Sequence, residues 1–166
     1  MKRTAIFLAT GAYAGLAPVA PGTAGSLVAS VALLLVSDFY HPYFFLATIF
    51  LLILGIWAAS VAEGHYKTLD APQVVIDEMV GMLISVWFLP ATWSVVAIAF
   101  FFFRAFDIVK PFPARRAEQA GEWLTKYIQN SPRLFSLAGG LGVMLDDVIA
   151  GIYANLATRV VWWLMN

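Results

Sequence analysis

The feature that most constrains this 166-residue chain is the stretch 43–62, which contains no charged side chain. A helix of about 20 apolar residues matches the hydrocarbon core of a bilayer, which is about 30 Å thick. Inside that core, backbone N–H and C=O groups must be hydrogen-bonded within the protein, and a helix achieves this. The stretch therefore predicts a membrane-spanning helix.

The rest of the chain has the composition of a membrane protein. It is 61% hydrophobic and only 12% charged, whereas soluble domains carry about 25% charged residues. We expect an all-α integral membrane protein with about four to five transmembrane helices, in one membrane-embedded domain over residues 1–166. Besides 43–62, helices are expected at 4–17 (short), from Ser26 to about Ser37, and at 74–89, 92–109 and 144–165.

Two segments differ from these apolar runs. Residues 18–26 hold two prolines and two glycines, which predicts a loop. Residues 114–138 are the one polar stretch and form a cytoplasmic linker, with an interfacial helix expected near 114–130.

Composition also excludes several classes of function. The chain has no cysteine, so thiolate metal sites and cysteine nucleophiles are absent. With only two histidines, a centre of several histidines is not expected, and His41 is interpreted as structural. A net charge of zero gives no basic field for nucleic acid.

The distribution of charges predicts that the two membrane faces of the protein differ. The connections 38–42 and 90–94 are nearly uncharged. If both face one side, all Lys and Arg except Arg159, and all Asp and Glu except Asp38, fall on the other side. The Lys and Arg bias predicts that this other side is cytoplasmic, and the clustered acids predict a polar site there.

Asp146 and Asp147 are adjacent carboxylates within an apolar run. An ionised carboxylate in hydrocarbon costs several kcal/mol unless it is paired or binds a cation. Nearby glycines at 139–142 are expected to bend the backbone, and the small residues 150–151 to let another helix approach. The alternative is that the two acids simply cap the last helix.

A second acidic pair, Asp77-Glu78, is expected in the first turn of the helix at 74–89, where the helix dipole favours negative charge. Carboxylate oxygens are the ligands that Mg²⁺ takes. Asp70, shortly before the pair, is a possible further ligand. The alternative is helix capping alone.

Cationic and hydroxyl side chains complete the pattern. Arg104, Asp107 and Lys110 recur every three residues, so they lie along one side of a helix end. Arg binds phosphate bidentately and Lys supplies a point charge. Thr23 and Ser26, in a glycine-containing loop before a helix, are further phosphate-binding candidates. A basic belt at the membrane interface and a capped turn are the plainer alternatives.

Together these groups predict a magnesium-dependent site for a phosphate ester. Asp77, Glu78, Asp146 and Asp147 are the expected metal ligands, and Asp107 joins them as a catalytic candidate. Whether a carboxylate or an activated water attacks phosphorus stays open. A cation transporter or channel that uses the one-sided acids is the alternative function.

Four sequence blocks, in order, resemble the phosphatidylglycerophosphatase A family over nearly the whole chain. They are PGTxGS from Pro21, VIDExxG from Val75, FRxxDxxKPxP from Phe103 and GGxGxMxDDxxAG from Gly139. The resemblance implies a bacterial inner-membrane, Mg²⁺-dependent lipid phosphatase that acts in phospholipid biosynthesis. Its substrate would be phosphatidylglycerophosphate and its products phosphatidylglycerol and phosphate. The link 114–138 is longer than is usual in the family, and Ala138 stands where a His often precedes the glycines.

Overall fold

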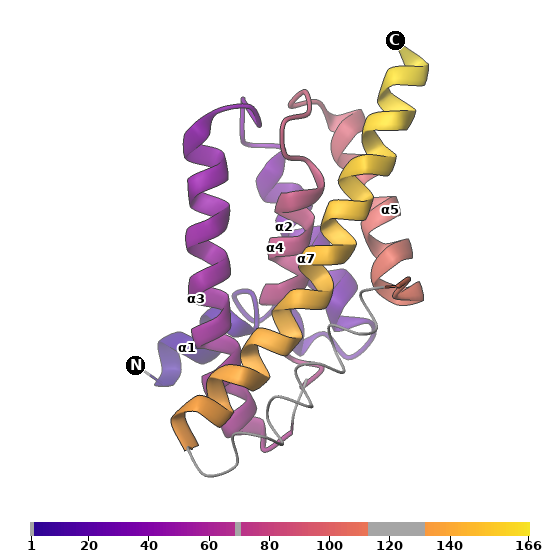
Figure 1. Cartoon of the computed structure of the whole chain (residues 1–166). Coiled ribbons are helices and arrows are strands. Elements are labelled where there is room, and N and C mark those ends of the chain that lie inside the picture. The colour runs from indigo at the N-terminus through magenta and orange to yellow at the C-terminus, as the bar shows by residue number, and fades with distance from the viewer. Residues whose placement is uncertain (1, 69–70, 113–131) are drawn as a thin grey trace.

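The computed structural model describes residues 2–68, 71–112 and 132–166, with side chains from Gly139 onward in the last range. All regular elements in these ranges are helical (Figure 1). They are α1 (Lys2–Ala9), the short 3₁₀ helix η1 (Ala14–Leu16), α2 (Pro21–Leu33), α3 (Pro42–Tyr66), α4 (Ile76–Ser85), α5 (Trp93–Val109) and α7 (Pro132–Met165).

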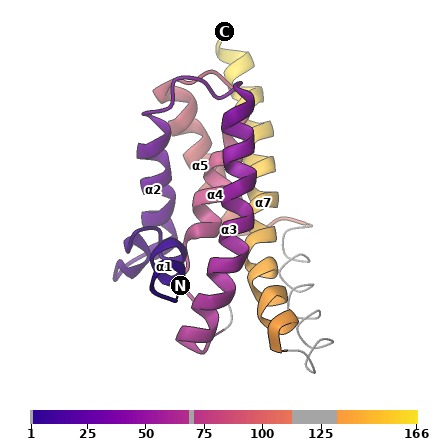
Figure 2. The ribbon, with the colours of Figure 1, turned by 90° about the vertical axis from the view of Figure 1, so that its left-hand side faces the viewer.

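The short helix α4 occupies the middle of the bundle. It packs against α2, α3, α5 and α7, so that it has helical neighbours on every side. α7 crosses the whole bundle and also contacts α3 and α5, while α1 packs on α3. Figure 2 shows α4 enclosed between the longer helices. Side chains on α4 are therefore held inside protein.

The helix expected at 43–62 is confirmed as α3, which extends beyond this range at both ends. Pro42 stands at its first turn, where its missing N–H costs nothing. His41 caps the helix by accepting a hydrogen bond from the Tyr43 N–H at 3.2 Å, which confirms its structural interpretation. Lys67, in the left-handed conformation, ends α3.

The N-terminal expectations were wrong in detail. Instead of one helix over 4–17, α1 ends at Ala9 and η1 follows, because the chain takes positive φ at Gly11, Ala12 and Tyr13. α2 begins at Pro21 rather than at Ser26.

The glycines of α2 serve packing rather than a loop. Proline is pre-organised for a first helical turn, so Pro21 starts the helix. A Cβ at Gly25 would lie 2.7 Å from the Val75 Cβ, closer than real contacts allow. The missing side chain therefore lets α2 lie directly against the segment that leads into α4.

α5 confirms the helix expected at 92–109. The Thr92 side chain caps its start by accepting from the Val95 N–H at 3.3 Å, and Lys110 ends it in the left-handed conformation before Pro111. α4, in contrast, is shorter than the expected 74–89. It stops at Ser85, and the connection that follows includes Phe88 at positive φ.

α7 differs most from its prediction of 144–165. It begins at Pro132 and runs through the glycines at 139–142 without a break, so these glycines do not bend the backbone. A Cβ at Gly140 would lie 2.5 Å from the Ile56 carbonyl oxygen, so glycine here permits close packing on α3. The acidic pair stands well inside the helix and caps nothing. The interfacial helix expected near 114–130 lies outside the described residues.

Two of the described helices could cross a membrane by length and composition, namely α3 and the Gly139–Met165 part of α7. Only 28% and 22% of their most apolar windows are buried. Helices in the core of a soluble protein would be mostly covered, so these exposed apolar faces indicate a membrane protein. The other described helices are shorter than a usual span, and the expected four to five spans stay a prediction.

Close packing of α3 and α7 gives a test of stability. We expect Gly140→Ala to lower the thermal unfolding temperature in detergent, because the new Cβ meets backbone atoms of Ile56 and Ser60. Overpacking of this kind costs about 1–3 kcal/mol. Gly64→Ala is the matched control, since a Cβ at this helical glycine meets nothing within 4 Å. Equal unfolding temperatures for the two variants would contradict the packing described here.

Candidate active site

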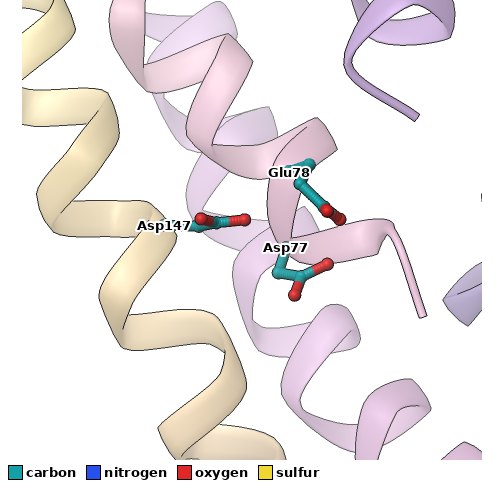
Figure 3. A group of neighbouring side chains, drawn as sticks. All are labelled: Asp77, Glu78 and Asp147. Carbon is teal, nitrogen blue, oxygen red and sulfur yellow. The ribbon is translucent and has the colours of Figure 1, made fainter. Parts of the chain in front are cut away.

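Three carboxylates from two helices, two of them buried and one half-buried, meet inside the bundle. Asp77 and Glu78 stand in the first turn of α4, and Asp147 reaches them from α7 (Figure 3). One oxygen from each lies within 4.8 Å of the other two. Asp77 and Asp147 are 7% and 3% exposed, so bulk water does not screen their repulsion. We call these three residues the acidic trio.

Two oxygens of the acidic trio lack partners. Asp77 Oδ1 and Glu78 Oε2 are buried and accept no hydrogen bond in the part of the chain that the structure describes. A buried polar atom without a partner costs free energy, so it indicates a missing ligand. Facing carboxylate oxygens with unused lone pairs are suitable donors for a hard divalent cation such as Mg²⁺. The residues present therefore fit a metal ion.

Arg104 links the acidic trio to two further blocks of the sequence. Its Nη1 lies 2.5 Å from Asp107 Oδ2 and 3.9 Å from Glu78 Oε1. The same nitrogen donates a long hydrogen bond of 3.4 Å to Ser26 Oγ on α2. Asp107 also interacts with Asp147. One guanidinium cannot balance this many carboxylates, so the site keeps an excess of negative charge.

Gly22 allows α2 to approach this group of charges. A Cβ at this position would collide with the Glu78 carboxylate and lie 3.3 Å from Arg104 Nη1. Ser26, one turn later, donates its hydroxyl proton to the Gly22 carbonyl at 2.9 Å while accepting from Arg104. The start of α2 is thus one wall of the site.

Asp146 points to a different partner from Asp147. Its Oδ2 accepts a hydrogen bond of 2.6 Å from Lys110 Nζ, where the chain leaves α5. Its Oδ1 accepts from the Asp147 backbone N–H at 3.1 Å. Asp146 is therefore outside the acidic trio, although it adjoins it. The nearby Tyr153 hydroxyl donates to the Phe112 carbonyl at 2.9 Å, which fastens the segment after Lys110 to α7.

Small residues bring α4 and α7 together at the site, as the sequence predicted for 150–151. A Cβ at Gly151 would lie 2.5 Å from the Gly81 carbonyl oxygen, and one at Gly81 would lie 2.8 Å from the Asp147 carbonyl oxygen. The packing role of Gly81 and the contact of Gly22 with Glu78 were not predicted from the sequence. For Gly81 a signal was present, since it is the one glycine among the bulky residues of α4.

Most of the predicted site residues lie in this one region. Thr23 is on α2 beside Gly22, but no hydrogen bond or ion pair joins it to the acids in the described part of the chain. Asp70 lies outside the described residues. The contacts described above bring together Ser26, Asp77, Glu78, Arg104, Asp107 and Asp147, with the pair Lys110–Asp146 next to them.

Comparison with known proteins decides the family. The model of the family described as phosphatidylglycerophosphatase A matches residues 7–162. The chain belongs to the phosphatidylglycerophosphatase A family. Its relatives in this family are phosphoric monoester hydrolases, so the chain is an enzyme of that class, and the alternative of a cation transporter is set aside.

Individual relatives cover most of the chain. Phosphatidylglycerophosphatase A of Haemophilus influenzae is 32% identical, with 95% of this chain and 89% of the relative aligned. That of Escherichia coli is 31% identical over 87% and 76%. A Bacteroides thetaiotaomicron protein named "Putative phosphatidylinositol-3-phosphatase" is 37% identical over 100% of both chains. No solved structure matches the chain.

Two serines of α2 test the contact between Arg104 and the first block. Ser26 and Ser30 are both buried, and each donates to the carbonyl four residues earlier, at 2.9 and 2.8 Å. Only Ser26 also accepts from Arg104. We expect Ser26→Ala to lower phosphate release from phosphatidylglycerophosphate by about two- to twelvefold, since a hydrogen bond contributes about 0.5–1.5 kcal/mol. Ser30→Ala is the control and should retain activity. Equal effects would show that the Arg104 contact is unimportant.

Proposed function

We propose that the protein hydrolyses phosphatidylglycerophosphate to phosphatidylglycerol and inorganic phosphate, with Mg²⁺ as cofactor. The observation that carries this proposal is the acidic trio with its two unpartnered oxygens, placed beside Arg104. Membership of the phosphatidylglycerophosphatase A family supports the reaction type and a phospholipid substrate. Phosphatidylglycerol formation is a step of phospholipid biosynthesis.

In this proposal the acids have separate tasks. Asp77, Glu78 and Asp147 hold the metal ion, since their oxygens already face one another. When bound, a divalent cation supplies positive charge that offsets the carboxylates and polarises a phosphoryl oxygen. Asp146 was also a predicted metal ligand, and we now propose that it orients Lys110 instead, because its carboxylate binds that ammonium group.

The cationic side chains bind the phosphate. Arg104 has five N–H donors, and its buried Nε has no partner among the described residues. Its Nε–H can therefore donate a hydrogen bond to a phosphate oxygen in addition to its present contacts, while Asp107 keeps the guanidinium in place. Lys110 adds a second positive charge, and Ser26 and Thr23 lie on the α2 side of the site. As water attacks phosphorus, the bond to the lipid oxygen breaks and that oxygen takes a proton.

The same arrangement supports a location in the bacterial inner membrane with several membrane passes and the site toward the cytoplasm. The relatives named above are bacterial, and α3 and α7 can span a bilayer. The helix α1, the end of α3 before Lys67 and the end of α5 before Lys110 lie in the same half of the bundle as the start of α4 (Figure 1), and the basic residues of these segments favour a cytoplasmic side there. A phospholipid could then keep its acyl chains in the bilayer while its headgroup reaches the acids.

A second candidate substrate has a specific observation in its favour. The Bacteroides thetaiotaomicron relative, named for a phosphatidylinositol phosphate substrate, is more similar to this chain than the two phosphatidylglycerophosphatases. Both substrates are phosphate monoesters on a polyol headgroup, so the acidic trio and Arg104 would serve either one. The headgroup is what distinguishes them.

A phosphate-release assay tests the proposal. Purified protein in detergent micelles receives phosphatidylglycerophosphate or a phosphatidylinositol phosphate, each with Mg²⁺ or with excess EDTA. We expect release that requires Mg²⁺, because three carboxylates meet in the described part of the chain and the ion pair found there with one of them is that of Arg104 with Glu78. Full activity in EDTA would refute the metal requirement. Faster release from the inositol lipid would transfer the substrate assignment to the second candidate.

The separate tasks of the adjacent aspartates give a further prediction. Asp147→Asn should abolish most activity and raise the Mg²⁺ concentration needed for half-maximal rate, because it removes a proposed ligand. Asp146→Asn should instead raise KM at an unchanged Mg²⁺ requirement. Lys110→Gln should have the same effect, and the double variant should lose no more than either single variant, since contacting residues act together. If the double variant instead lost the sum of the two single losses of activity, Asp146 and Lys110 would act independently, which would contradict the proposed role of Asp146.

A further inference from the structure

One face of α7 follows α4 along its whole length. Asp147, Gly151, Asn155 and Arg159 recur every fourth residue, and residues four apart lie on the same face of a helix. Asp147 joins the acidic trio and Gly151 touches the Gly81 carbonyl. Asn155 and Arg159 bind the other end of α4 (below). One face therefore touches α4 from its first turn to beyond its last.

At the C-terminal end of α4, side chains of α7 add hydrogen bonds to the local turn bonds, such as the one from the Trp87 N–H to the Ile84 carbonyl at 3.1 Å. The last carbonyls of a helix have no partner within the helix. Asn155 Nδ2 donates to the carbonyl oxygens of Ile84 at 3.4 Å, Ser85 at 3.1 Å and Trp87 at 2.9 Å. Arg159 Nη2 donates to the same Trp87 oxygen at 2.7 Å. The carbonyl groups at the C-terminal end of α4 thus find hydrogen-bond donors without a further turn of helix.

Asn155 and Arg159, which we call the two anchors, also bind each other. Arg159 Nε donates to Asn155 Oδ1 at 2.8 Å, which fixes the orientation of the amide so that its NH₂ group faces α4. Non-helical backbone at membrane depth requires such internal partners. The charges agree with the helix dipole, because α4 has two carboxylates at its N-terminus and a guanidinium at its C-terminus.

We propose that Asn155 and Arg159 are positioning residues for the acidic trio. By fixing the end of α4 on α7, they set how far along α7 the helix stands and how it is rotated. Asp77 and Glu78 belong to α4, whereas Asp147 belongs to the same helix as the anchors. A slide or rotation of α4 would therefore change the distances between the trio's oxygens. The anchors act from afar, since Arg159 lies about 18 Å along α7 from Asp147. This inference rests on the proposed metal site.

The test measures metal binding directly. Mn²⁺ suits the same carboxylate ligands as Mg²⁺, and the free ion can be counted by electron paramagnetic resonance during a titration of protein in detergent. We expect Asn155→Ala and Arg159→Gln to weaken Mn²⁺ binding by about three- to tenfold, below or at the lower edge of the effect of removing a direct partner of a ligand. Arg159→Lys keeps one donor for the Trp87 carbonyl and should fall between wild type and Arg159→Gln.

Leu156→Ala is the matched control. Leu156 follows Asn155 on α7 but is 55% exposed on the outer face, so its truncation should leave Mn²⁺ affinity unchanged. In the anchor variants, added Mg²⁺ should restore most of the phosphate release, which a general loss of fold would not allow. If Asn155→Ala does not fold, the Arg159→Lys and Arg159→Gln pair provides the same comparison.

The outcomes separate the two proposals. Wild-type Mn²⁺ affinity in both Asn155→Ala and Arg159→Gln would overturn the positioning role. Two results together would support the positioning role and refute the proposed reaction. In the first, the wild-type protein binds Mn²⁺ but releases no phosphate from either lipid. In the second, Asn155→Ala and Arg159→Gln bind Mn²⁺ more weakly than the wild type. A wild-type protein that binds no Mn²⁺ would overturn the metal site and this inference together.

Discussion

The rest of the structure depends on the enclosure of three carboxylates within 4.8 Å of one another in an apolar helical bundle. Such a group is unfavourable without compensation, because low-dielectric surroundings strengthen repulsion. The nearby fold supplies part of the compensation through Arg104 and through the N-terminal end of α4, whose dipole favours negative charge. The remaining deficit is what a divalent cation would meet. Stability and proposed chemistry therefore have one electrostatic origin.

Close approach of helix backbones makes this enclosure possible. Without side chains at Gly81 and Gly151, α4 and α7 come near enough for their acidic side chains to meet, and the missing side chain of Gly22 lets α2 lie against the Glu78 carboxylate. Aspartate has a short reach, so a separation increased by one methyl group would move its oxygens out of metal-binding range. Glycines of this kind serve the chemistry indirectly, because they determine where the backbone carrying Asp77 and Asp147 stands.

The sequence predicted which acids gather better than it predicted the helix boundaries. Charge and spacing drew attention to Asp77, Glu78 and Asp147, because ionisable groups in apolar runs are costly, and the structure brings these three carboxylates together. α3 and α5 were also recognised, since their caps at His41 and Thr92 and their uninterrupted apolar runs act locally.

Boundaries failed where tertiary packing overrides local preference. Glycines and prolines suggested a loop before Ser26 and a bend near 139–142, yet these glycines lie in helices that pack tightly on α4 and α3. Likewise, the end of α4 at Ser85 involves distant partners as well as the local turn that contains Phe88 at positive φ. Asn155 binds the Ser85 carbonyl across 70 positions of the chain, and Arg159 binds the Trp87 carbonyl across 72. Single-sequence patterns do not register such partners.

The unbroken course of α7 from Pro132 to Met165 determines which parts of the site can move. A continuous helix of this length, about 50 Å, transmits force along its axis and bends only gradually. Asp146 and Asp147 are thus fixed points to which substrate must adapt. Any adjustment between an empty and a loaded site falls to the ends of other elements, above all the turn at Lys110 and the first residues of α2. The catalytic cycle would then consist of small movements of these segments relative to α7, which stays in place.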